Sequence, residues 1–163
     1  MRRFGFGIRL AALPVAFALG AGVAPAQTPI GSAAITGPVR VDGQPASGSV
    51  QVMNASRLST GDNANVTFTF AQGGVVGLAG QADVVVTRAP AGPHVQLVCG
   101  DVTVTSSTPT TVMNVNGGRV MAKEGRVTVT AGGKTTVVKK GKEKDFDGPI
   151  TVAVEGAGSV AVV

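Results

Sequence analysis

Few residues in this sequence have the chemistry of a catalytic or metal-binding centre. His94 is the only histidine and Cys99 the only cysteine in the 163 residues. A zinc site needs three or four ligands of such types. A serine hydrolase would have to use His94 as its base, without the Gly-x-Ser-x-Gly elbow that exposes the nucleophile. The sequence therefore predicts no catalytic residues, no cofactor-binding residues and no metal ligands, which leaves an enzyme of unknown type as the least favoured function.

His94 and Cys99 also have simple structural interpretations. His94 stands between Pro93 and Val95 and is expected on a surface loop. Cys99 follows the apolar run Val95–Val98, so we expect it to be buried as a small hydrophobic residue. A single cysteine cannot form an intrachain disulfide. A reactive thiol and an intermolecular bridge remain as alternatives.

The aspartates mostly neighbour Gly or Asn, where their side chains commonly cap turns. They are Asp42, Asp62, Asp83, Asp101, Asp145 and Asp147. Asp145 and Asp147 have the ligand type that calcium prefers, but the full calcium-loop pattern is missing around them. The turn interpretation is therefore favoured for this pair as well.

Basic residues gather near the C-terminal end of the sequence. The cluster comprises Lys134, Lys139, Lys140, Lys142 and Lys144, interrupted by Glu143 and Asp145. No aromatic residues alternate with these lysines, as they would in a platform that stacks bases. Lysines commonly protect an exposed strand from unwanted pairing, which is the favoured interpretation. Contact with an anionic polymer or with lipid headgroups is the alternative.

The first 26 residues have the three parts of a secretory signal peptide. Residues 1–9 carry three arginines and no acid, residues 10–24 are apolar or small, and Val23–Ala26 ends in the small-x-small pattern of a cleavage site. We predict a signal-peptide helix that is cut after Ala26. A membrane-spanning helix needs about 20 apolar residues, more than this core supplies. The mature protein is therefore expected in the periplasm or outside the cell, and not across the membrane.

The three arginines of the predicted signal peptide account for most of the net charge. The chain carries +5 as a whole, but only about +2 without its first 26 residues. Such a small charge excludes the electrostatic footprint of a nucleic-acid-binding protein. Residues 27–34 are small and polar and predict a linker, and residues 35–163 have a length typical of one domain.

That domain has the pattern of short strands and turns. Residues 66–70 alternate strictly, with apolar side chains at even positions and threonine at odd ones. A period of two residues indicates a strand with one buried face. Asp42-Gly43 predicts a tight hairpin turn. No segment after residue 26 has a helical period, so we expect an all-β fold.

An internal repeat is the strongest regular feature of the sequence. Val95–Thr105 aligns without a gap with Val120–Thr130, 25 positions later, and a weaker copy follows Gly148 at residues 150–152. Each copy predicts a strand, a glycine corner and a second strand, because glycine permits a backbone corner that other residues resist. Stacked repeats favour a short-stranded β-solenoid or β-roll. A β-sandwich of hairpins explains the same pattern almost as well.

Several of these segments resemble a FecR-like domain. Val95–Val104 is similar to its "v.L..G.v.v" segment, Glu124–Val129 to its "eG.V.V" segment, and Val137–Gly141 to its closing "l.aGq" turn. The resemblance extends over residues 39–144 and implies a β-coil in the periplasm. The family's central "GT.F.V" segment is missing from residues 108–118. There is also no room before Leu10 for an anti-sigma segment, so sigma-factor regulation is not carried over.

The expected function is therefore an exported, FecR-like, non-catalytic binding or protein-interaction module of the bacterial cell envelope. Its partner would be an envelope protein, or a glycan or lipid. The glycine-cornered Val repeats also resemble the periplasmic proteins that bridge lipopolysaccharide across the envelope. That resemblance implies a periplasmic lipid- or glycolipid-binding bridge protein as the alternative.

Overall fold

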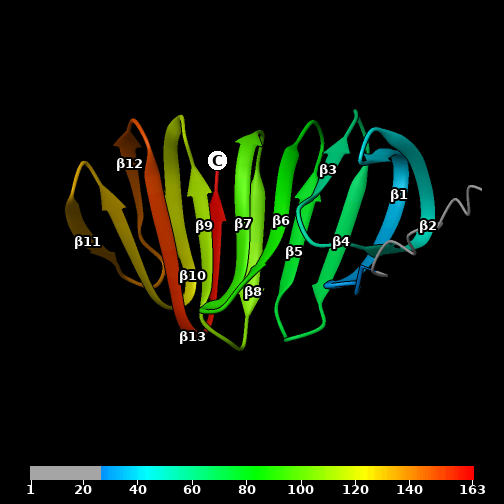
Figure 1. The fold of residues 1–163 in the computed structure, drawn as a ribbon. Helices are drawn as coiled ribbons and strands as arrows, with labels where there is room; N and C mark the ends of the chain where they lie inside the picture. Colours follow the sequence, from blue (N-terminus) through cyan, green and yellow to red (C-terminus); the bar gives the residue numbers. More distant parts are fainter. Residues whose placement is uncertain (1–26) are drawn as a thin grey trace, which may run out of the picture.

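The computed structural model describes residues 27–163, and the predicted signal peptide lies outside this range (Figure 1). The described chain forms thirteen strands and no helix, which confirms the all-β prediction. The strands are β1 (Gly31–Val41), β2 (Gln44–Val52), β3 (Ser56–Thr60), β4 (Asn65–Phe70), β5 (Val75–Ala79), β6 (Asp83–Ala89), β7 (Gly92–Cys99), β8 (Val102–Ser106), β9 (Thr110–Asn114), β10 (Gly117–Ala131), β11 (Lys134–Val138), β12 (Glu143–Asp147) and β13 (Ile150–Val162).

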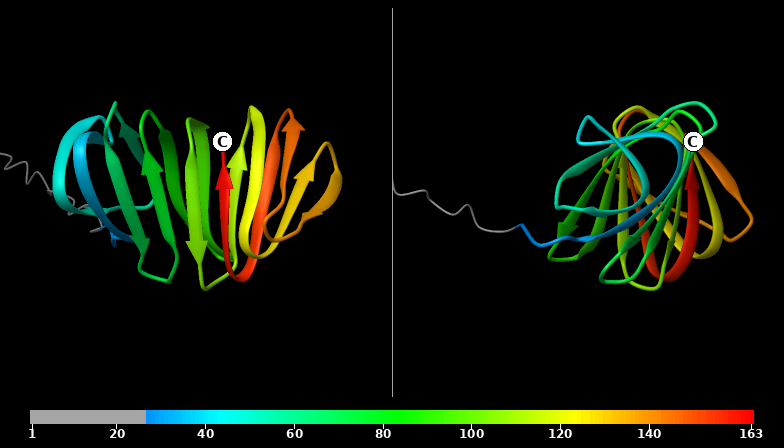
Figure 2. Two further views of the ribbon diagram at one scale, coloured as in Figure 1. Left: turned by 180° about the vertical axis from the view of Figure 1, so that it is seen from behind. Right: turned by 90° about the vertical axis from the view of Figure 1, so that its right-hand side faces the viewer.

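Nine of these strands close into a ring. The order around the ring is β1, β3, β6, β7, β9, β13, β8, β5 and β4. It closes because two long strands each pair with two shorter ones. The first half of β1 pairs with β4 and its second half with β3, while β13 pairs first with β9 and then with β8. The result is a flattened barrel whose two faces share β1 at one end and β13 at the other (Figure 2).

Additional strands extend the barrel beyond both of these ends. β2 runs antiparallel to β1 over the whole length of β1. At the other end β10 pairs with β13, and β10 in turn pairs with β11 and β12. β11 pairs with the second half of β10 and β12 with its first half, so the two short strands line β10 from one face of the barrel to the other. The molecule therefore ends in β2 on one side and in β11–β12 on the other.

Glycines permit the long strands to bend between the two faces. Gly125 interrupts the pairing of β10 with β13 and has a φ of +74°. A Cβ atom at this position would lie 2.5 Å from the carbonyl oxygen of Ala157. Only glycine tolerates both this conformation and this close approach. β2 bends in the same way at Gly48, with a φ of +70°.

The interior is a single core of small apolar side chains. Residues 66, 68 and 70 are buried and Thr67 and Thr69 are exposed, as the alternation predicted. Phe68 and Phe70 meet edge to face, with their ring centroids 4.5 Å apart. Valines from both faces fill most of the remaining volume, which suits the narrow space inside a flattened barrel.

The repeat has the predicted local geometry. In the first copy β7 turns at Gly100 into β8, and in the second copy β10 bends at Gly125. The four equivalent apolar pairs all point into the core, at positions 95 and 120, 97 and 122, 102 and 127, and 104 and 129. Ile150 and Val152 of the third copy are buried as well.

The arrangement of the copies differs from a stack of repeats. β13 lies between them, because Val162 pairs with Val102 on one side and with Val120 on the other. Neighbouring copies therefore do not cover each other as solenoid repeats do. The pairing closes the sheet on itself, which neither the solenoid nor the sandwich prediction included.

Two segments differ from the sequence-based expectation in their strand boundaries. β1 begins at Gly31, so the predicted linker 27–34 extends only to residue 30. Ala33 is fully buried, and small side chains here permit close packing on β4. β9 and β12 were not predicted. Both are polar or charged strands whose pairing depends on distant parts of the chain.

Candidate interaction edge

β2 is the most exposed strand at one end of the molecule. It pairs only with β1 among the described strands, so its other edge has no strand partner in residues 27–163. Figure 1 shows β2 curving around the end of the barrel. An unpaired edge presents backbone N–H and C=O groups that can pair with another chain.

This edge lacks the charges that usually protect such a strand. β2 has the sequence QPASGSVQV, without any Lys, Arg, Asp or Glu. Pro45 is its only common protective residue, since proline removes one backbone donor from an edge. Ala46 and Val50 pack against the core but stay partly exposed, because no further strand covers them. β2 therefore combines free hydrogen-bonding groups with incompletely buried apolar side chains.

The turn before β2 is fixed to the barrel by Asp42. Asp42 and Gly43 have φ values of 52° and 80°, which is the conformation of the predicted tight turn. One Asp42 carboxylate oxygen accepts a hydrogen bond from the Arg57 backbone N–H at 2.8 Å, and the other accepts one from the Ser56 hydroxyl at 2.8 Å. The Asp42 N–H donates in return to the Arg57 carbonyl at 2.9 Å. This end of β2 is therefore held in a defined position before any partner binds.

Arg57 extends the polar cluster onto the neighbouring strand. Its Nε donates to both carboxylate oxygens of Asp83, at 2.8 and 3.0 Å, and its Nη2 forms an ion pair with the same group. These hydrogen bonds lower the pKa of Asp83, although partial burial acts in the opposite direction. Ser59 also donates to Asp83 at 3.2 Å. The cluster is a structural anchor, because both of its carboxylates, Asp42 and Asp83, accept hydrogen bonds from neighbouring strands.

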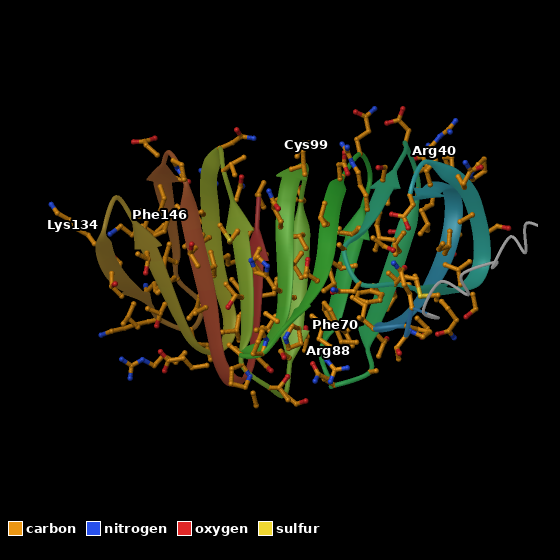
Figure 3. The ribbon with its side chains drawn as sticks, viewed as in Figure 1. Arg40, Phe70, Arg88, Cys99, Lys134 and Phe146 are labelled. Atoms are coloured by element: carbon orange, nitrogen blue, oxygen red, sulfur yellow. The ribbon has the colours of Figure 1, made fainter. Side chains whose placement is uncertain are left out.

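The opposite end of the molecule carries the predicted lysine cluster. Lys134 and Lys144 lie on β11 and β12, and the other three lysines lie on the turn between these strands. All five are exposed, and none of them forms an ion pair with another described residue. Figure 3 shows Lys134 at this end and Arg40 near the β2 end. The lysines thus follow the outermost strand, which is where protection of an edge would be needed.

His94 lies in β7, so the prediction of a surface loop was wrong. The strand continues through residues 92–99 because Pro93 is buried and His94 pairs with Thr87 and Thr111 on the two neighbouring strands. Partial burial lowers the pKa of His94. No serine, carboxylate or cysteine forms a hydrogen bond with its imidazole among the described residues.

Cys99 is exposed, so the prediction that it is buried was also wrong. Val95 and Leu97 of the same strand point into the core, and strict alternation would turn residue 99 inward too. However, the register shifts opposite Asp83 and Val84, and the chain turns at Gly100. The end of β7 therefore directs the thiol outward, as Figure 3 shows.

The aspartates are distributed over the surface and do not form a cluster. Asp42 and Asp62 lie in turns as predicted, whereas Asp145 and Asp147 belong to β12, contrary to the turn interpretation. Asp145 accepts a hydrogen bond from Arg119 Nε at 2.8 Å. Within residues 27–163 no three His, Cys, Asp or Glu side chains lie together in a group that could hold a metal ion.

The apolar strand faces point into the filled core rather than into a groove. The hollows on the outside are shallow, such as a depression of about 370 Å³ over β4, β5 and β8. Its lining consists mostly of small uncharged residues such as Thr67, Gly77 and Thr103, and it also includes Asp101. No helix in the described part of the chain is long and apolar enough to cross a membrane.

The sequence-based predictions did not single out β2 as an outer strand. The relevant signal was the contrast between segment 44–52, which has no charged residue, and segment 134–144, which has five lysines. That contrast has a meaning only when both segments are known to be outer strands, which depends on the pairing of the whole sheet.

Comparison with known proteins does not add a relative to these observations. No protein-family model, no curated protein and no solved structure matches this chain.

Proposed function

We propose that this chain is an exported, FecR-like, non-catalytic interaction module of the bacterial cell envelope, and that it binds its partner by strand addition to β2. In this mode an extended segment pairs with an exposed sheet edge through main-chain hydrogen bonds. The observation that carries the proposal is the exposed, uncharged edge of β2 at one end of the barrel.

Two features support β2 as the binding element. The Asp42 contacts hold the hairpin turn in place, which reduces the entropy that binding would otherwise cost. Ala46 and Val50 would gain apolar contact from an added strand. The export pattern in residues 1–26 supports a location in the envelope.

A capture experiment tests this function. The exported protein, purified from the periplasmic fraction of a bacterial host, is immobilised and exposed to envelope extract that also contains untagged copies of the same protein. Two variants are compared with it, each carrying two added lysines at alternate strand positions. S47K/S49K changes the edge of β2, whereas the control T67K/T69K changes exposed positions of the central strand β4.

We expect the wild type and T67K/T69K to retain the same partner and S47K/S49K to lose it, because lysines on an edge oppose strand addition. Partner capture that is equal for all three proteins, or absent for all three, would contradict binding through β2. Circular dichroism of the variants confirms that each one is folded.

A further inference from the structure

We infer that the partner of β2 is β2 of a second copy of this chain, paired antiparallel about a two-fold axis through Gly48. This inference rests on the proposed function, since it names the occupant of the same edge. A two-fold pair is self-complementary, so both copies use one surface and the assembly closes as a dimer.

The position of the bend supports this symmetry. Gly48 is the middle residue of β2, and the strand bends there from one face of the barrel to the other. In Figure 2 the β1–β2 hairpin curves over this end of the barrel. A two-fold axis through Gly48 exchanges the two halves of β2 between the copies. The bend of one copy then lies beside the bend of the other. The paired strands can therefore follow each other over their whole length.

The side chains around Gly48 match under the same symmetry. Residues opposite each other in an antiparallel pair point to the same face of the sheet. Ala46 would lie opposite Val50 of the second copy on the side of the core, and Ser47 would lie opposite Ser49 on the outside. The two partly exposed apolar side chains of each copy would thus cover those of the other copy. The outer pairs are small hydroxyl side chains, which do not obstruct close approach.

The opposite end of the molecule is unsuited to the same arrangement. Its outer edge changes direction at Gly141, in the turn between β11 and β12, where Lys140 and Lys142 flank the glycine. A two-fold axis through Gly141 would place Lys140 opposite Lys142 of the other copy, and it would do so twice. It would also place Lys139 opposite Glu143, but Glu143 already forms an ion pair with Arg119 of its own chain. Like charges directly opposite each other destabilise strand pairing. Self-pairing is therefore favoured at β2 and opposed at β11–β12, which predicts a dimer and not a continuing fibre.

The test measures molar mass by light scattering during size-exclusion chromatography of the exported protein over a wide concentration range. We expect the wild type to have twice the monomer mass. In S47K/S49K the two new lysines would meet those of the second copy. Two like-charge contacts should raise the dimer dissociation constant about tenfold.

A charge-reversed variant makes the symmetry itself testable. In S47K/S49E each introduced lysine would lie opposite an introduced glutamate of the second copy, so this variant should remain a dimer. The control T67K/T69K should also remain a dimer. This pattern would not arise if the S47K/S49K substitutions only weakened the fold.

Three results would overturn the inference. They are a monomeric wild type, a dimer that S47K/S49K leaves intact, and an open series of larger assemblies. If the wild type is monomeric but still captures a different partner through β2, self-pairing is wrong and the proposed function stands. If nothing depends on β2 in either experiment, both proposals fail.

Discussion

Individual polar residues in this protein serve the fold. Asp42 and Asp83 each accept hydrogen bonds from neighbouring strands, and Arg57 joins their two sites through its backbone and its side chain. The Arg57 side chain of this ion pair is exposed, and ion pairs in contact with solvent contribute little on their own. Their value here is geometric, because they fix the hairpin that leads into β2.

His94 should make the stability of the protein depend on pH. Partial burial lowers its pKa below the ordinary value of 6.5, so the folded state binds a proton less readily than the unfolded state. The free energy of unfolding should therefore fall as the pH decreases from about 7 through the lowered pKa. Urea unfolding of the wild type and of His94→Gln at several pH values measures this difference.

The His94→Gln variant retains every carboxyl group, so it controls for the acid sensitivity of the aspartates. The wild type should lose more stability than the variant between neutral and mildly acid pH. Parallel curves for the two proteins over this interval would show that His94 does not contribute.

At the scale of the elements, glycine bends allow single strands to serve both faces of the barrel. Gly125 and Gly48 have similar positive φ values but different surroundings. A Cβ atom at position 125 would lie 2.5 Å from the Ala157 carbonyl oxygen, whereas position 48 has nothing within 4 Å. Gly77 has an ordinary φ, and its nearest neighbour would lie at 3.8 Å.

We expect alanine substitutions at these three positions to lower the free energy of unfolding by different amounts. Gly77→Ala should change the free energy of unfolding by no more than about 0.5 kcal/mol. Gly48→Ala should cost about 1–2 kcal/mol, because the left-handed conformation is strained for alanine. Gly125→Ala should cost about 3 kcal/mol or more, since the steric contact adds to this strain. Thermal unfolding of the three variants measures the order, and equal losses at positions 48 and 125 would contradict it.

At the scale of the whole molecule, the two outermost strands differ in their protection. β11–β12 carries five exposed lysines, and β2 carries no charged residue. The small net charge of residues 27–163 therefore conceals an uneven distribution of charge along the barrel. We therefore expect the β2 end to accept a strand and the β11–β12 end to resist one.

Removing lysines from the protected end should make that end associate as well. We expect K140S/K142S to assemble beyond the wild-type state, because the like charges that oppose pairing at Gly141 are gone. The control R88S also loses an exposed positive charge, but on β6, away from β11–β12. Light scattering at equal protein concentration measures the difference, and the free energy of unfolding should change by no more than about 0.5 kcal/mol.

If both variants scatter light equally, the lysines affect only the general solubility of the protein and not the edge. If K140S/K142S stays at the wild-type mass, something other than the lysine charge prevents association at the edge formed by β11 and β12.

The sequence by itself determined the class of the fold and much of its local geometry. Local sequence alone predicts the strict alternation over residues 66–70 and the repeat copies around Gly100 and Gly125. Both features depend only on neighbouring residues, so tertiary contacts were not needed to predict them. The near absence of His and Cys likewise limited the available chemistry. These properties follow from short-range patterns and from composition.

Only the tertiary structure decided which strands meet. β13 lies between the two copies of the repeat, and this pairing closes the ring in place of a stack. The outward turn of Cys99 depends on a register shift with β6, and the pairing of the charged strand β12 depends on β10. Long-range hydrogen bonding also makes β2 an outer strand. A strand lies at an edge when no other strand pairs with one of its sides, and this depends on the pairing of the whole sheet.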